Sequence, residues 1–228
     1  MNSIGIIGGI GYKATSYFYN RINTLYELKM GKGNSCPILL VSLNFKEINA
    51  LLPYGIDEVA EIIKPSIQYL EEQETICNIL INNTMHKALD IVLANKNTKT
   101  PYCHIGKLLN EKLVEIEDSK VVILGTAFTM KDDYLKSFVP DKHAILIPSE
   151  EIIQQVDELR QLYYNSTDEN KAKKCYEKLE SNYPENTIFI IACTELSIAF
   201  STLKNNKNWI DTIDLQCESA LNKLINKK

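Results

Sequence analysis

The residues of this sequence best suited to do chemistry are Cys193, Thr194 and Glu195, which directly follow an apolar run at 187–192 and precede a segment with helical character. A cysteine at the start of a helix lies in the positive end of the helix dipole, which favours the thiolate over the thiol. The N–H groups at the same end can bind a carboxylate. We therefore expect a reactive thiol at Cys193. The remaining cysteines are expected to be inert core thiols, the usual fate of this residue type: Cys36, Cys77, Cys103, Cys175 and Cys217.

A second polar group follows the apolar run at 75–81 and comprises Asn82, Asn83, Thr84 and, two residues later, His86. Asparagine and threonine supply amide and hydroxyl groups that bind a ligand or cap the helix that follows. Both interpretations stay open at this point. A single histidine such as His86 is more often structural than catalytic, and the same expectation holds for the other two histidines, His104 and His143.

A glycine-rich turn follows the first apolar run, and residues 9–14 fit the GxGxxA form of the dinucleotide fingerprint. That fingerprint also requires an acidic residue at the end of the second strand, where this chain has Asn44 and Phe45. We therefore expect a turn in which the N–H groups, including that of Gly9, face a small anion. Neither a dinucleotide nor another organic cofactor is expected.

Composition excludes several classes of protein. The chain has 228 residues with 25 Lys and Arg against 29 Asp and Glu, a net charge of −4, whereas nucleic-acid binding requires a basic surface. The sequence has no CxxC pair, the spacing that is typical of a zinc site. With no basic leader and no apolar run near the roughly 20 residues that cross a bilayer, we expect a cytoplasmic protein that does not bind membranes.

Short apolar runs typical of strands alternate with longer amphipathic patterns typical of helices, which predicts parallel sheets covered by helices. The expected strands are 4–7, 37–43, 75–81, 121–124, 144–147 and 187–192, and the expected helices are 13–30, 56–72, 85–94, 107–117, a long one within 150–181, and 215–225.

The pattern is repeated: residues 4–8 resemble 121–125, and residues 78–82 resemble 189–193. The repeat predicts an α/β fold with two pseudo-symmetric three-layer lobes, each with a parallel sheet. We expect residues 1–98 with 205–228 to form the first lobe and residues 99–204 the second. Ligands of such sheets bind at the carboxyl ends of the strands, which places the expected active site in the cleft between the lobes.

The chain resembles the aspartate/glutamate racemase family, the cofactor-independent amino-acid racemases, over nearly its whole length. The segments that carry the resemblance are 4–9 with Ala14, Thr15 and Tyr19, then 44–48, 83–86, 124–130 and 193–195. The resemblance implies the two-lobed fold and an isomerase that takes a proton from the α-carbon with one cysteine and returns it from the opposite face with a second.

The resemblance implies Cys193 as one acid/base, with Asn82 at the position of the family's other cysteine. It also implies a small amino acid or dicarboxylate as the partner, with a homodimer as a possible assembly. The residues expected to bind the substrate are Gly9, Asn83, Thr84, Thr126, Thr129, Thr194 and Glu195. Lys13, Lys46 and Arg160 are candidates to recognise a side-chain carboxylate.

A neutral amide at Asn82 cannot serve as a general base, so three functions stay open. The first is a racemase in which Asn82 or an ordered water acts opposite Cys193. The second is a one-cysteine decarboxylase or isomerase of the same superfamily. The third is a catalytically silent protein that binds carboxylates.

Overall fold

The computed structural model describes residues 2–94, 98–203 and 208–226, and the chain divides into two compact units. Unit 1 comprises Met1–Ile105 and Gln216–Lys228, and unit 2 comprises Gly106–Leu215. None of the described helices is long and apolar enough to span a membrane.

Unit 1 contains a parallel sheet in the order β2-β1-β3, with β1 at Ile4–Gly8, β2 at Ile38–Ser42 and β3 at Cys77–Leu80. Every residue of β1 and β3 is buried, because β1 is central and helices cover the sheet. This burial explains the uninterrupted apolar runs in the sequence, since strands of a covered parallel sheet have no solvent face.

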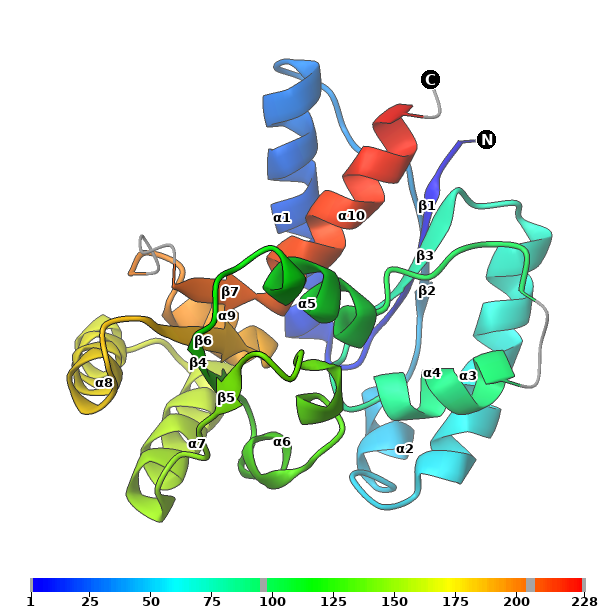
Figure 1. The fold of residues 1–228 in the computed structure, drawn as a ribbon. Helices are drawn as coiled ribbons and strands as arrows, with labels where there is room; N and C mark the ends of the chain where they lie inside the picture. Colours follow the sequence, from blue (N-terminus) through cyan, green and yellow to red (C-terminus); the bar gives the residue numbers. More distant parts are fainter. Residues whose placement is uncertain (1, 95–97, 204–207, 227–228) are drawn as a thin grey trace. The chain divides into compact units, whose positions relative to one another are not determined.

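The helices of unit 1 lie on both sides of this sheet (Figure 1). They are α1 at Tyr12–Met30, α2 at Phe45–Asn49, α3 at Ile56–Glu72, α4 at His86–Ala94 and most of α10 at Thr212–Asn226. Helix α3 buries an apolar stripe that includes Val59, Ile63 and Ile67 against the sheet and α4. That stripe has helical spacing, which is why the sequence predicts α3 at its observed bounds.

Unit 2 contains a parallel sheet in the order β5-β4-β6-β7. Its strands are β4 at Lys120–Leu124, β5 at Ala144–Ile145, β6 at Thr187–Ile191 and β7 at Trp209–Asp211. The helices are α5 at Ile105–Val114, α6 at Ala127–Lys131, a short 3-10 turn at Lys136–Phe138, α7 at Glu150–Asn165, α8 at Glu169–Asn182 and α9 at Thr194–Ala199. Helices α7, α8 and α9 pack on Val122 and Leu124 of β4.

The two units repeat one topology, which confirms the predicted α/β fold with parallel sheets. In each, the first strand is central, the second lies on one side and the third on the other. The repeat extends further, because β7 pairs with β6 while an isolated parallel bridge joins Asn78 of β3 to Tyr102. The helix after each of these edges belongs to the other unit: α5 lies mainly in unit 2, and α10 mainly in unit 1.

The structure differs from the sequence expectations in one long helix and in short elements, among them the helices α2 and α6, that the sequence did not predict. The charged segment 150–181 forms two helices, because Ser166 is extended and the Asp168 side chain caps α8 by accepting from Lys171 N. Strand β7 was not predicted. The expected lobe boundaries, after residues 98 and 204, stay a prediction, and residue 204 lies outside the described part of the chain.

Candidate active site

Cys193 lies two residues beyond the end of β6, at the N-cap position of α9. Its side chain is buried, and its thiol donates a hydrogen bond to Glu195 Oε2, with 2.9 Å between sulfur and oxygen. The strand ends here because Cys193 begins the turn of α9, which brings residues 193 and 195 to the same end of the helix. The thiol therefore has a carboxylate as its direct proton acceptor.

The expectation that helix position favours the thiolate is not met in this structure. Burial, reinforced by the charge and the hydrogen bond of Glu195, raises the pKa of the Cys193 thiol well above its usual value, and the positive charge of Arg160 opposes this only in part. Helix α9 has six residues, so its dipole is short. The pKa shift therefore favours the protonated thiol at Cys193.

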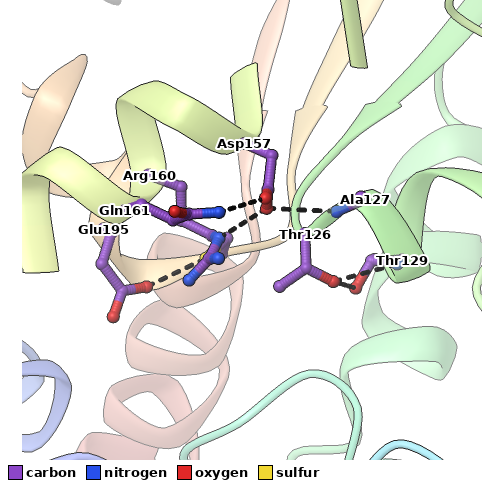
Figure 2. Close-up of polar contacts among 8 residues, drawn as sticks. Thr126, Ala127, Thr129, Asp157, Arg160, Gln161 and Glu195 are labelled. Atoms are coloured by element: carbon purple, nitrogen blue, oxygen red, sulfur yellow. Dashed lines mark hydrogen bonds and ion pairs between the residues drawn. The ribbon is translucent and has the colours of Figure 1, made fainter. Parts of the chain in front are cut away.

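Arg160 of α7 connects this pair to the rest of unit 2 (Figure 2). Its Nε donates to Asp157 Oδ1 at 2.8 Å, and its guanidinium interacts electrostatically with both Cys193 and Glu195. Asp157 also accepts from Gln161 Nε2 at 2.7 Å and from the N–H of Ala127 at 3.3 Å. Although burial raises the pKa of the Asp157 carboxyl, these donors lower it by more, so the carboxylate is the stable form.

Thr126 ends the loop between β4 and α6, and Thr129 lies in the first turn of α6; Asp157 holds this segment through the N–H of Ala127. Thr126 is the N-cap of α6, and its Oγ1 accepts from Thr129 N at 3.0 Å and lies 2.9 Å from Thr129 Oγ1. Figure 2 shows this loop beside the Asp157–Arg160 pair. The carboxyl ends of the adjacent strands β4 and β6 thus carry Thr126, Thr129, Cys193 and Glu195 within one unit.

Asn82 lies two residues beyond the end of β3 and is half-buried. Its Oδ1 accepts a hydrogen bond from Met85 N at 3.1 Å, so the side chain stabilises the turn that precedes α4. The capping interpretation of Asn82 is therefore supported, while a role in catalysis stays a prediction. Asn83 and Thr84 are also half-buried and belong to the same turn.

The histidines are buried structural groups. His86 Nε2 lies 3.2 Å from Leu80 O, and its ring meets that of His104 edge-on at 4.6 Å. Burial, together with the charge of His104, lowers the pKa of His86 to about 3, so its ring is neutral at neutral pH. His104 pairs with Asp90 at 3.1 Å. His143 accepts from Ser119 N and donates to Leu113 O, as expected for a structural residue.

Gly9 forms the turn after β1 with a positive φ of 83°, a conformation that favours glycine. A Cβ at this position would lie 2.2 Å from Leu43 O, so only glycine fits. The N–H of Gly9 donates to Thr15 Oγ1 at 2.8 Å and is therefore used within the turn. The expectation that this N–H faces an anion stays a prediction.

The predicted site residues divide between the units. Cys193, Thr194 and Glu195, with Thr126 and Thr129, belong to unit 2, and the remaining ones are Gly9, Asn82, Asn83 and Thr84 of unit 1. A single site containing all of them stays a prediction. Within the described residues no group of three His, Cys, Asp or Glu side chains is arranged to hold a metal ion.

Sequence reasoning did not find Asp157. It reads as an ordinary charged residue of an amphipathic helix, and only its spacing to Arg160, one helical turn, indicates that the two pair.

The other cysteines are buried and reduced, as expected. Burial raises the pKa of Cys36 to about 12 and that of Cys175 to about 11. The hydrogen bond between the thiols of Cys77 and Cys103, together with burial, raises the pKa of Cys77 far above its usual value.

The fold defined by these two sheets is that of the aspartate/glutamate racemases. An aspartate racemase homologue from Pyrococcus horikoshii OT3 has a TM-score of 0.81 with 23% identity, covering 99% of this chain and 100% of its own. A proposed Asp/Glu racemase from Yersinia pestis has a TM-score of 0.80 with 23% identity and the same coverage. The aspartate racemase of Picrophilus torridus has a TM-score of 0.73 with 18% identity, covering 98% and 94%.

No protein-family model matches the sequence. The likeness in structure nevertheless supports the family resemblance inferred from the sequence motifs, because it extends over nearly the whole chain in each case.

Proposed function

We propose that this protein is a cofactor-independent amino-acid racemase of the aspartate/glutamate type. The observation that carries the proposal is the hydrogen bond between the Cys193 thiol and the Glu195 carboxylate at the carboxyl end of β6. A thiol with a proton acceptor 2.9 Å away can become a thiolate by passing its proton to that acceptor. The likeness to solved racemases supports the same assignment.

In the proposed reaction Cys193 transfers its proton to Glu195, and the resulting thiolate removes the proton from the α-carbon on one face of the amino acid. The electron pair of the broken C–H bond stays on the substrate and is delocalised into its α-carboxylate. Hydrogen-bond donors around that carboxylate stabilise the developing charge. A proton returned to the opposite face gives the enantiomer, whereas a proton returned by Cys193 regenerates the starting amino acid.

The opposite face is assigned to the first lobe, where Asn82 or a water held by it takes the place of a cysteine. An amide has no useful basicity, so the proton on this face has to come from a water. The proposed substrate-binding groups are the backbone N–H groups and side chains of the strand-end turns. They are Gly9, Asn83, Thr84, Thr126, Thr129 and Thr194. Glu195 is less suited to bind a carboxylate, because its own carboxylate faces Cys193 and Arg160.

A one-cysteine decarboxylase or isomerase is the second candidate, and the geometry of Asn82 favours it. Asn82 Oδ1 already accepts a hydrogen bond from Met85 N, so we assign no acid/base role to Asn82. Cys193 is then the one assigned acid/base group. A single thiol suffices to protonate a carbanion left by decarboxylation. A catalytically silent carboxylate-binding protein is the third candidate.

The assembly and setting are also proposals. We propose that the lobes comprise residues 1–98 with 205–228, and 99–204, and close on an amino acid or dicarboxylate. We further propose a cytoplasmic enzyme that needs no metal or organic cofactor and forms a homodimer.

Incubation of the protein with each enantiomer of aspartate, glutamate and related amino acids in D₂O tests the proposal. Racemisation with deuterium at the α-carbon is the expected result. A product other than the enantiomer supports the one-cysteine decarboxylase or isomerase instead. Binding of the amino acid without exchange supports the silent protein. The Cys175→Ala variant serves as a control, because it removes another buried thiol of the same unit.

A further inference from the structure

The charged groups around Cys193 are more numerous than a thiol and its acceptor require. Arg160 has a partly buried side chain, 22% exposed, and Asp157 one that is 18% exposed. Neither belongs to the loops that carry the proposed substrate-binding groups, since both lie on α7. Their position beside the Cys193–Glu195 pair therefore needs its own explanation (Figure 2).

We propose that Arg160 and Asp157 are positioning residues for the acid/base pair. Asp157 holds the guanidinium of Arg160 beside Cys193 and Glu195, so that one negative charge is balanced whichever of the two groups holds the proton. This inference rests on the proposed function for its catalytic meaning, and it extends that function to two residues of α7.

The geometry of Arg160 supports this role. Its Nε is engaged by Asp157 Oδ1 at 2.8 Å, which fixes the plane of the guanidinium, and its charge acts on Cys193 and Glu195 together. A guanidinium keeps its charge at every physiological pH. When the proton moves from Cys193 Sγ to Glu195 Oε2, an S–H bond breaks, an O–H bond forms and the electron pair stays on sulfur. The negative charge thus moves between two atoms that both face the same cation.

Asp157 is itself held from two further directions. Gln161 Nε2 donates to Oδ2, and the N–H of Ala127 donates to Oδ1. The latter bond ties α7 to the N-terminal turn of α6, which contains Thr126 as N-cap and Thr129. Asp157 therefore links the orientation of Arg160 to a turn of the proposed substrate site. Asp211 at the end of β7 is a further carboxylate beside α9, where it accepts from Ser197 Oγ at 3.0 Å.

The test measures the alkylation of Cys193 by iodoacetamide from pH 6 to pH 10, without substrate, by mass spectrometry of the Cys193 peptide. The variants are Arg160→Gln, Arg160→Lys and Asp157→Asn. Glu158→Gln is the matched control, because Glu158 lies on the same helix, is exposed, and pairs with Gln154 and Lys171 away from Cys193. Fluorescence of Trp209, the one tryptophan of the sequence, which is buried in unit 2, checks that each variant is folded.

We expect Arg160→Gln to slow alkylation at a given pH by about tenfold, since one unit of pKa corresponds to a tenfold change in thiolate. Asp157→Asn should slow it in the same direction by less, because Arg160 remains but is no longer held. Arg160→Lys, which keeps the charge, should lie close to the native protein, and Glu158→Gln should match it.

An unchanged alkylation profile in folded Arg160→Gln overturns the inference, and so does faster alkylation in Asp157→Asn, which would show that Asp157 acts only through its own charge. If Arg160→Gln raises KM for the amino acid while the alkylation profile stays the same, Arg160 binds substrate and the inference is wrong. If Arg160→Gln does not fold, Arg160→Lys and Asp157→Asn decide the question. Failure of the native protein to exchange any amino acid refutes the proposed function, whereas the alkylation series tests the inference independently of it.

Discussion

The carboxyl ends of β3 and β6 are equivalent positions in the repeated topology, yet their side chains differ in chemistry. Two residues beyond β3 stands Asn82, whose oxygen is consumed by the N–H of Met85. Two residues beyond β6 stands Cys193, whose thiol is bonded to the Glu195 carboxylate. The same backbone position thus supports a turn in unit 1 and presents a titratable pair in unit 2. A repeated fold fixes where a side chain is placed and leaves open what that side chain does.

The difference extends one helical turn further. Four residues after Asn82, His86 contacts His104, and four residues after Cys193, Ser197 donates to Asp211. In both units the contact joins the helix after the third strand to the segment that pairs with that strand: the segment after Tyr102 in unit 1, and β7 in unit 2. Unit 1 makes this contact with two buried rings and unit 2 with a hydrogen bond, so the equivalent contact differs in chemistry between the units.

The largest effect is expected from Cys193→Ala. If only the end of β6 carries an acid/base group, this change should lower α-deuterium exchange about 10³-fold, since a positioned acid or base contributes roughly 10²–10⁴. Cys175→Ala, in the core of α8, should leave the rate unchanged. Proton-exchange rates for both variants, measured by NMR in D₂O, check this. Exchange that survives in Cys193→Ala would contradict the comparison.

The Asn82→Cys substitution places a thiol after β3, at the position equivalent to that of Cys193 after β6. A thiol opposite Cys193 should raise inversion relative to exchange by about 10²-fold, the lower end of the range for a positioned acid or base. Asn82→Ala is the control, because it removes the bond to Met85 N without adding a thiol and should cost about 1 kcal/mol of stability. Inversion and deuterium incorporation are measured for both enantiomers. Equally fast inversion of both enantiomers by the native protein would show that unit 1 already provides a second acid/base group.

The turns after the first strand of each unit are expected to differ in their need for glycine. Gly9→Ala should destabilise unit 1 by about 2 kcal/mol, because φ is positive and the new Cβ would lie 2.2 Å from Leu43 O. Gly125→Ala places its Cβ 3.0 Å from Thr129, where a small shift relieves the contact, so a loss below about 1 kcal/mol is expected. Denaturant unfolding followed by circular dichroism gives both values. Equal losses would mean that the turns are equivalent after all.

The last prediction concerns the pH dependence of stability in unit 1. The pKa of His86 falls from 6.5 to about 3 in the folded chain because of burial and the neighbouring His104. Between these values the unfolded state binds a proton that the folded state does not, so stability is complete above pH 6.5 and is lost as pH falls. The loss reaches up to about 2 kcal/mol at pH 5.

Hydrogen exchange of peptides from β3 and α4 in unit 1, corrected for the intrinsic effect of pH, measures this loss. His86→Gln should flatten the dependence, because glutamine does not titrate. A dependence that is unchanged in this variant would assign the pH effect to another group.

The elements of the fold were predictable where burial leaves a periodic pattern. The stripe of Val59, Ile63 and Ile67 gives α3 its bounds, and the all-apolar runs of β1 and β6 are those of covered parallel strands. Strand β7 has three residues, too few for a pattern. The division of α7 from α8 depends on Asp168, which caps a helix only once the chain has turned.

The strand-end positions of the candidate residues were predictable from the sequence, and their interactions were not. The position of Cys193 after a buried strand is a local property of the sequence. The pKa of its thiol depends on Glu195, on Arg160, which is 33 residues before Cys193 in the chain, and on burial that only the folded core provides. A rule based on helix position predicts a thiolate, and burial beside a carboxylate reverses it.

The last helix, α10, belongs mainly to unit 1, and this has a consequence for the order in which the units can fold during synthesis. Gln216 of α10 donates to Leu80 O and Cys103 O, which lie 136 and 113 residues earlier in the chain. A ribosome therefore releases the strands of unit 1 long before the helix that closes that unit exists. Domains tend to fold as they emerge from the ribosome. Unit 2 is therefore synthesised completely before unit 1, and the surface of unit 1 that α10 covers stays exposed until α10 has been made.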